Sequence, residues 1–150
     1  MPAEVDIIVT SSDGTEIRLI AEAKLSVPDL HSEEEKLKSA MLSMSSPVGL
    51  LVTPDRMLVY LDRYVSQTTE SVDQVGDFDV SPLLRFKPVS ASPDEARRFE
   101  TAVQQWLESL PGSAAQVSRK DNCFWNALNS YILPAVETGK IRAAAPRYRS

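Results

Sequence analysis

Two acidic residues and a lysine near the start of the chain have the types and spacing needed for metal-assisted chemistry. Glu22 and Lys24 are two residues apart in an extended stretch, so their side chains point to the same side of a strand. Asp6 lies in the preceding run of β-branched residues, which we expect to form the partner strand of a hairpin. The spacing therefore predicts that two carboxylates and one ammonium group converge.

Carboxylate oxygens suit a hard divalent cation such as Mg²⁺, which proteins commonly hold with one or two carboxylates, water and substrate phosphate. A metal in that position polarises a phosphoryl group and acidifies a bound water. Lys24 could orient or deprotonate that water, or offset the charge that develops on the phosphate. The pattern thus predicts metal-assisted hydrolysis of a phosphate ester.

The hairpin that would position these groups turns at Asp13-Gly14, a pair that favours tight turns because Gly accepts a positive φ. Pairing residues 9–10 with 16–17 puts Asp6 near residue 20, one pleat away from Glu22. Alternation then divides the second strand into one face with Ile17, Leu19, Ala21 and Ala23 and another with Arg18, Ile20, Glu22 and Lys24.

Helices and strands alternate through the rest of the chain. A capping box that would start a helix is formed by Ser32-Glu33-Glu34-Glu35. It is followed by an apolar stripe of Leu37, Ala40, Met41 and Met44. We expect strands over 48–53 and 57–64, a loop over 65–77, a short strand or irregular edge over 80–86, and helices over 93–110 and 121–133. This order predicts an α/β (α+β) sheet domain, one domain over residues 1–150.

Composition limits the classes of protein that fit. The formal net charge of −5 argues against holding nucleic acid by bulk charge alone. No apolar run approaches the length of a membrane span, and no basic-then-apolar leader opens the chain. The single cysteine, Cys123, fits a reducing compartment. We therefore expect a soluble, cytoplasmic protein without a membrane partner.

The motif resembles that of the PD-(D/E)XK nuclease superfamily, in which an Asp at the start of one strand precedes Glu-x-Lys on the next. The stretches around Asp6 and around Glu22-Ala23-Lys24 look like the two motif strands of restriction-endonuclease-like domains. The continuation over residues 41–64 is similar to the N-terminal nuclease domain of type I restriction R subunits, so the resemblance covers residues 2–64. It implies a mixed sheet flanked by helices.

The resemblance also implies roles for individual residues. Asp6 and Glu22 would bind Mg²⁺, or Mn²⁺ as an alternative, with help from the carbonyl of Ala23. Lys24 would serve the attacking water, and DNA would be the substrate. Because no sequence-reading module is evident, we expect the chain to work as a homodimer or with a partner subunit, in restriction or defence.

The chain departs from the family pattern at its front end. No proline adjoins Asp6, and the helix and strand that precede this aspartate in the family have no counterpart in the five residues before it. We hypothesise that the helix over 121–133 and the stretch 140–145 supply them, as in a circular permutation. A structure with residues 121–145 far from Asp6 would contradict this hypothesis.

Three functional hypotheses follow. The first is a magnesium-dependent nuclease with Asp6, Glu22 and Lys24 as catalytic residues. The second is a non-catalytic binding or assembly module that keeps the nuclease-like fold. The third is an unrelated sheet domain that binds proteins, in which Asp6 and Glu22 would point to opposite faces.

Overall fold

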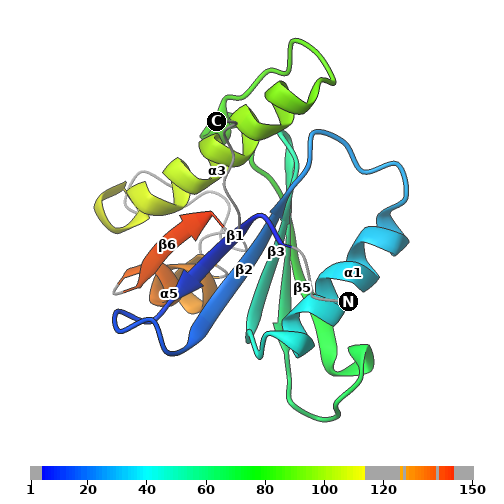
Figure 1. The fold of residues 1–150 in the computed structure, drawn as a ribbon, viewed down its shortest axis with the longest axis vertical. Helices are drawn as coiled ribbons and strands as arrows, with labels where there is room; N and C mark the ends of the chain where they lie inside the picture. The colour runs from blue at the N-terminus through cyan, green and yellow to red at the C-terminus, as the bar shows by residue number, and fades with distance from the viewer. Residues whose placement is uncertain (1–4, 114–125, 127, 138, 144–150) are drawn as a thin grey trace.

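One six-stranded sheet, in the order β5-β4-β3-β2-β1-β6, forms the centre of the protein (Figure 1). The structure, a computed structural model, describes residues 5–113, 126, 128–137 and 139–143. The strands are β1 (Ile7–Thr10), β2 (Ile17–Ala23), β3 (Val48–Val52), β4 (Arg56–Asp62), β5 (Val72–Asp79) and β6 (Lys140–Ala143). The helical segments are α1 (Leu30–Ser43), η1 (Thr69–Ser71), α2 (Ser81–Leu84), α3 (Pro93–Ser113), the π-helical η3 (Leu128–Ile132) and α5 (Leu133–Glu137).

Within the described sheet, β2 and β3 run parallel, and the other neighbouring strands are antiparallel. A parallel pair needs a crossover connection, which α1 provides. Helix α1 covers one face of the sheet, whereas α3 and α5 lie on the opposite face (Figure 1). The sequence-based prediction of a mixed α+β sheet flanked by helices is therefore confirmed.

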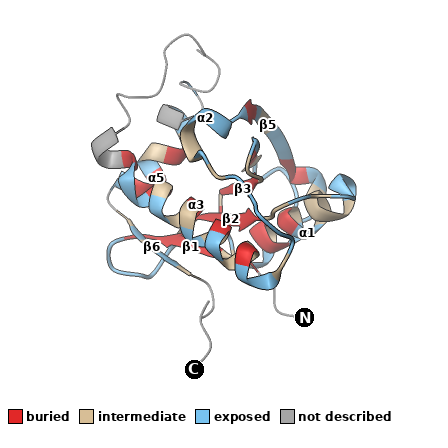
Figure 2. Cartoon of the chain, turned by 90° about the horizontal axis from the view of Figure 1, so that it is seen from above, coloured by how far each residue is buried: buried red, intermediate tan, exposed pale blue. Residues whose placement is uncertain are grey.

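Both faces of the sheet are buried, which gives two apolar cores. The core beneath α3 and α5 includes Leu19, Ala21 and Ala23 of β2, and the core beneath α1 includes Ile20 of the same strand. The alternation predicted for these four residues is confirmed. All five residues of β3 are buried, as expected for a central strand covered on both sides (Figure 2).

The register of the first hairpin differs from the prediction. The turn contains Gly14 at a φ of 78°, as predicted, but the register shifts between Val9 and Thr10, which pair with Leu19 and Ile17. This β-bulge inserts one extra residue into β2, so Ile7 pairs with Ala21. The bulge also turns Ile17 toward the α1 face, where it packs against that core instead of sharing a face with Leu19.

Helix α1 begins two residues before the predicted capping box. Asp29 is its N-cap, and the Asp29 carboxylate accepts a hydrogen bond of 3.2 Å from the Ser32 backbone N–H. Ser32 therefore lies inside the first turn, and the prediction that Ser32 caps the helix is wrong. The buried stripe of Leu37, Ala40 and Met41 is confirmed, while Met44 is the C-cap residue.

Residues 72–79 form the edge strand β5, although the sequence predicts a loop over 65–77. An edge strand has few buried positions, and in β5 only Val72 and Phe78 are buried, so its apolar pattern is weak. The predicted strand or irregular edge over 80–86 is also wrong, because Ser81–Leu84 forms the short helix α2. The Asp79 carboxylate, just before this helix, accepts a hydrogen bond from the Ser81 N–H.

The predicted helix over 93–110 is confirmed as α3, with the Ser92 hydroxyl accepting from the Glu95 N–H. Part of the predicted 121–133 helix, residues 121–125 and 127, lies outside the described residues, and the rest is helical from 128 to 137. No helix of the described chain is both long and apolar enough to cross a membrane.

Strand β6 lies antiparallel to β1, with Ala143 opposite Ile7 and Lys140 opposite Thr10. The turn that leads into it is tight, because a Cβ on Gly139 would come within 2.5 Å of the Thr10 carbonyl oxygen and 2.7 Å of the Ala135 carbonyl oxygen. The described part of the C-terminal segment thus lies beside the strand that follows Asp6, where the permutation hypothesis places it.

Candidate functional site

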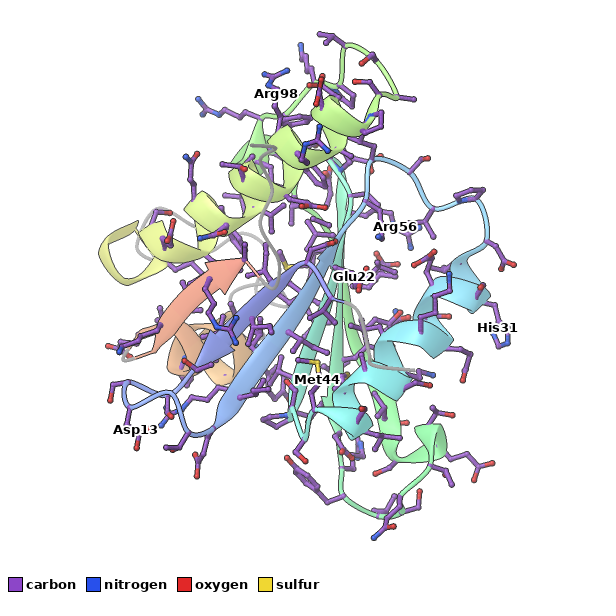
Figure 3. All side chains as sticks on the ribbon, in the orientation of Figure 1. Asp13, Glu22, His31, Met44, Arg56 and Arg98 are labelled. Carbon is purple, nitrogen blue, oxygen red and sulfur yellow. The ribbon has the colours of Figure 1, made fainter. Side chains whose placement is uncertain are left out.

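The three candidate residues come from the hairpin. Asp6 directly precedes β1, Glu22 lies near the end of β2, and Lys24 follows β2. Because Thr10 pairs with Ile17 and the bulge then adds one residue, Asp6 continues a register in which it lies level with Glu22, rather than one pleat away as predicted. Figure 3 shows Glu22 on the side of the sheet that faces α1.

The side chains of all three residues meet on this face. The Lys24 ammonium nitrogen Nζ lies 3.2 Å from Glu22 Oε2 and 3.9 Å from Asp6 Oδ2. The two carboxylates therefore face a common point, which one cation already shares. This geometry contradicts the third hypothesis, which requires Asp6 and Glu22 to point to opposite faces.

Ala23 orients the Asp6 carboxylate through its backbone. The Ala23 N–H donates a hydrogen bond of 2.8 Å to Asp6 Oδ2, while the Asp6 N–H donates to the carbonyl oxygen of Ala21. The Ala23 side chain packs into the core on the opposite face. The backbone of Ala23 thus lies between the two acids.

Burial dominates the electrostatics of Glu22, whose side chain is 10% exposed. Burial, and after it the charge of Asp6, raise the pKa of the Glu22 carboxyl to about 7, although Lys24 partly opposes both effects. A carboxyl group with this pKa is present in both its protonated and its ionised form near neutral pH. Perturbations of this kind, where a buried acid has a specific charged neighbour, are typical of functional sites.

The pKa of Lys24 is shifted upward, which keeps its side chain charged. Burial lowers the pKa of the Lys24 ammonium, but the Asp6 and Glu22 carboxylates together outweigh burial and raise it above its ordinary value. In this arrangement Lys24 is protonated at neutral pH. It can donate hydrogen bonds and offset negative charge, but it has no lone pair with which to accept a proton from water.

Sequence reasoning missed a further acid near the site, Glu33 in the first turn of α1. Its charge contributes to raising the pKa of both Glu22 and Lys24. Glu33 also forms an ion pair of 3.7 Å with Lys36. No spacing rule links Glu33 to the hairpin, because α1 is brought over the sheet by tertiary packing.

Asp6 and Glu22 place carboxylate oxygens, the donor type that Mg²⁺ prefers, on one face of the sheet. In the part of the chain that the structure describes, no group of three or more His, Cys, Asp or Glu side chains is arranged to hold a metal ion. Mg²⁺ is usually held by one or two carboxylates, with water and substrate phosphate as the other ligands. Two carboxylates that face one point can supply the protein share of such a ligand set.

Comparison with known proteins leaves this geometry as the basis for assigning a function. No model of a known protein family matches the chain, and neither a curated protein nor a solved structure is found to match it.

Proposed function

We propose that this protein is a magnesium-dependent nuclease that hydrolyses phosphodiester bonds in DNA. The observation that carries the proposal is the convergence of Asp6, Glu22 and Lys24 on one face, with Lys24 Nζ within 3.9 Å of both carboxylates. Two acidic groups and a charged lysine are the combination that metal-assisted phosphate chemistry needs.

Each residue has a definite part in the proposed reaction. Asp6 and Glu22 would hold Mg²⁺, with the Ala23 carbonyl as a further ligand. The bound metal would polarise the scissile phosphate and lower the pKa of an attacking water. Lys24, which is protonated, positions that water or offsets charge on the phosphate. Of the roles that the sequence left open for Lys24, general base is the one that its protonation disfavours.

The arrangement of elements supports membership of the PD-(D/E)XK superfamily. The resemblance implies a motif-bearing hairpin followed by a helix beside the sheet and a further strand, and this order of elements is present in β1, β2, α1 and β3. The strand β6, antiparallel to β1, takes the place of the strand that precedes the aspartate in that family. The chain would then be a permuted member that acts in restriction or defence in the cytoplasm, as a homodimer or with a partner subunit.

Two basic residues on β6 offer contacts for the DNA backbone. Arg142 is exposed and pairs with Ile8, a residue of the α1-side core, so Arg142 projects on the same side of the sheet as the proposed site. Lys140 is exposed two residues away, on the same side. Cations beside the acidic centre would attract phosphate despite the negative net charge of the chain.

Hydrolysis of bis(p-nitrophenyl) phosphate and of DNA tests the proposal. We expect Mg²⁺-dependent hydrolysis by the wild type, and losses of about 100-fold or more in Glu22→Ala and Lys24→Ala. Glu16→Gln is the matched control, because it removes an exposed acid at the far end of β2. Hydrolysis that survives in Glu22→Ala would contradict the proposal, and a wild type that binds DNA without hydrolysing either substrate would favour the non-catalytic module.

A further inference from the structure

A cavity of about 380 Å³ lies between the sheet and the start of α1. Its apolar lining includes Leu51 of β3 and Leu58 of β4, both almost completely buried. Its rim is formed by the loop after β2, including Leu25 and Ser26, and by the turn between β3 and β4. This volume is at the lower end of the range of about 300–1,000 Å³ that is typical of small-molecule sites.

The cavity lies one strand away from the proposed metal site. Glu22 pairs with Leu51, and Leu51 pairs with Leu58, so these three residues are successive neighbours across three strands. Adjacent strands are about 4.8 Å apart, which places the cavity floor one strand away from Glu22. Leu25, on the rim, directly follows Lys24. A group bound in the cavity would therefore adjoin a phosphate held at the site.

The rim combines hydrogen-bond donors and acceptors in fixed positions. The Arg56 guanidinium is held by Asp77 through hydrogen bonds of 3.1 Å and 2.5 Å. The Asp55 carboxylate accepts a hydrogen bond of 2.9 Å from the Thr53 hydroxyl. Figure 3 shows Arg56 and Glu22 on the same side of the sheet, toward α1. An apolar floor with a polar rim suits a flat heteroaromatic ring that has polar edges.

We propose that this cavity binds one unstacked nucleobase of the substrate, from a nucleotide next to the phosphate held by Asp6, Glu22 and Lys24. This inference rests on the proposed nuclease function, because the nearby phosphate is what delivers the base. A base can enter only after it leaves the stack and its pair, and that step is easiest in a single strand or at an unpaired position. The substrate is therefore single-stranded or locally unpaired DNA rather than a continuous duplex.

The test compares two oligonucleotides that differ only in their bases. A fluorescein-labelled thymidine oligonucleotide and an abasic one of the same length are titrated with the full chain in Ca²⁺, and fluorescence anisotropy reports binding. Burial of one base against the apolar floor of the cavity should give the thymidine oligonucleotide about tenfold tighter binding in the wild type. Equal affinity for the two oligonucleotides would overturn the proposal.

Filling the cavity should remove this discrimination. Ser26→Trp places a large ring on the exposed rim, and Leu30→Trp, at the first residue of α1, is a second variant that fills it from the helix side. Both variants should bind thymidine and abasic oligonucleotides equally. Val65→Trp is the matched control, since Val65 is 74% exposed and lies outside the cavity lining. Discrimination that persists in folded Ser26→Trp and Leu30→Trp would overturn the proposal.

Hydrolysis of bis(p-nitrophenyl) phosphate separates this inference from the proposed function, because that substrate has no nucleobase. A wild type that hydrolyses it but does not discriminate between the oligonucleotides is a nuclease without this base pocket. A wild type that does not hydrolyse it contradicts the nuclease function, and the ratio of the two oligonucleotide affinities still decides whether the cavity binds a base.

Discussion

Replacing Glu22 by Gln should stabilise the metal-free protein at neutral and alkaline pH. Burial, together with the charge of Asp6, raises the pKa of the Glu22 carboxyl from 4.5 to about 7. The folded protein therefore keeps this proton to a higher pH than the unfolded chain does, so ionisation opposes folding. The penalty grows as the pH rises from 4.5 and is complete above about 7.

The size of the change in the free energy of unfolding follows from the pKa shift of Glu22. Each pKa unit corresponds to about 1.4 kcal/mol, so a rise from 4.5 to about 7 lowers the free energy of unfolding by about 3 kcal/mol at pH well above 7. Lys24 loses one of its two anionic neighbours in the variant, which offsets part of the gain. We expect Glu22→Gln to raise the free energy of unfolding by about 1–3 kcal/mol at about pH 8 and by less than about 1 kcal/mol at about pH 5.

Urea denaturation in EDTA at the two pH values measures this difference for the wild type and Glu22→Gln. Glu16→Gln, which removes an exposed carboxylate from the same hairpin, should show almost no change at either pH. A Glu22→Gln variant less stable than the wild type at about pH 8, or a gain that is the same at both pH values, would refute the reasoning. Added Mg²⁺ should narrow the gap, because the wild type binds it more tightly.

The remaining predictions concern the charge of Lys24, the packing of the helices and the DNA surface. Lys24→Met should lower the rate of phosphodiester hydrolysis by about 100–1,000-fold without weakening Mg²⁺ binding, since it removes charge and leaves both carboxylates; rates and calorimetric titration measure the two effects. Tyr60→Phe should lower the free energy of unfolding by about 1–2 kcal/mol in urea denaturation, because the Tyr60 hydroxyl donates a 2.5 Å hydrogen bond to Glu34, while hydrolysis stays unchanged. Gly139→Val should lower the free energy of unfolding by about 1–3 kcal/mol in the same assay, since the valine side chain would clash with two carbonyl oxygens. Unaltered stability would argue against the tight turn into β6. Arg142→Ala should weaken DNA binding and reduce by about one the slope of log affinity against log salt, whereas an unchanged slope would show that Arg142 contacts no phosphate.

The part of the site that the sequence could predict depends on local rules. Alternation along β2 placed Glu22 and Lys24 on one side, and the Asp13-Gly14 turn predicted the hairpin that brings Asp6 to them. The level of Asp6 relative to Glu22 could not be derived in this way. It depends on a bulge opposite Thr10, and a one-residue insertion in a ladder leaves no distinctive residue pattern.

Features that arise from tertiary packing cannot be predicted from local sequence patterns. The edge strand β5 alternates weakly because only Val72 and Phe78 are buried, so it was predicted as a loop. The raised pKa of Glu22 depends on its burial in the folded protein, which no local pattern of the sequence indicates. The sequence alone leaves several roles open for Lys24, whereas its short distances to both carboxylates hold it in its charged form.

Calorimetric titration of Mg²⁺ into the wild type, Asp6→Asn and Glu16→Gln at about pH 8 tests the central claim, that Asp6 and Glu22 together hold the metal. We expect one Mg²⁺ to bind the wild type and Glu16→Gln with equal affinity, and binding to fall by at least about tenfold in Asp6→Asn. Equal binding by all three proteins, or no binding by any of them, would contradict the account.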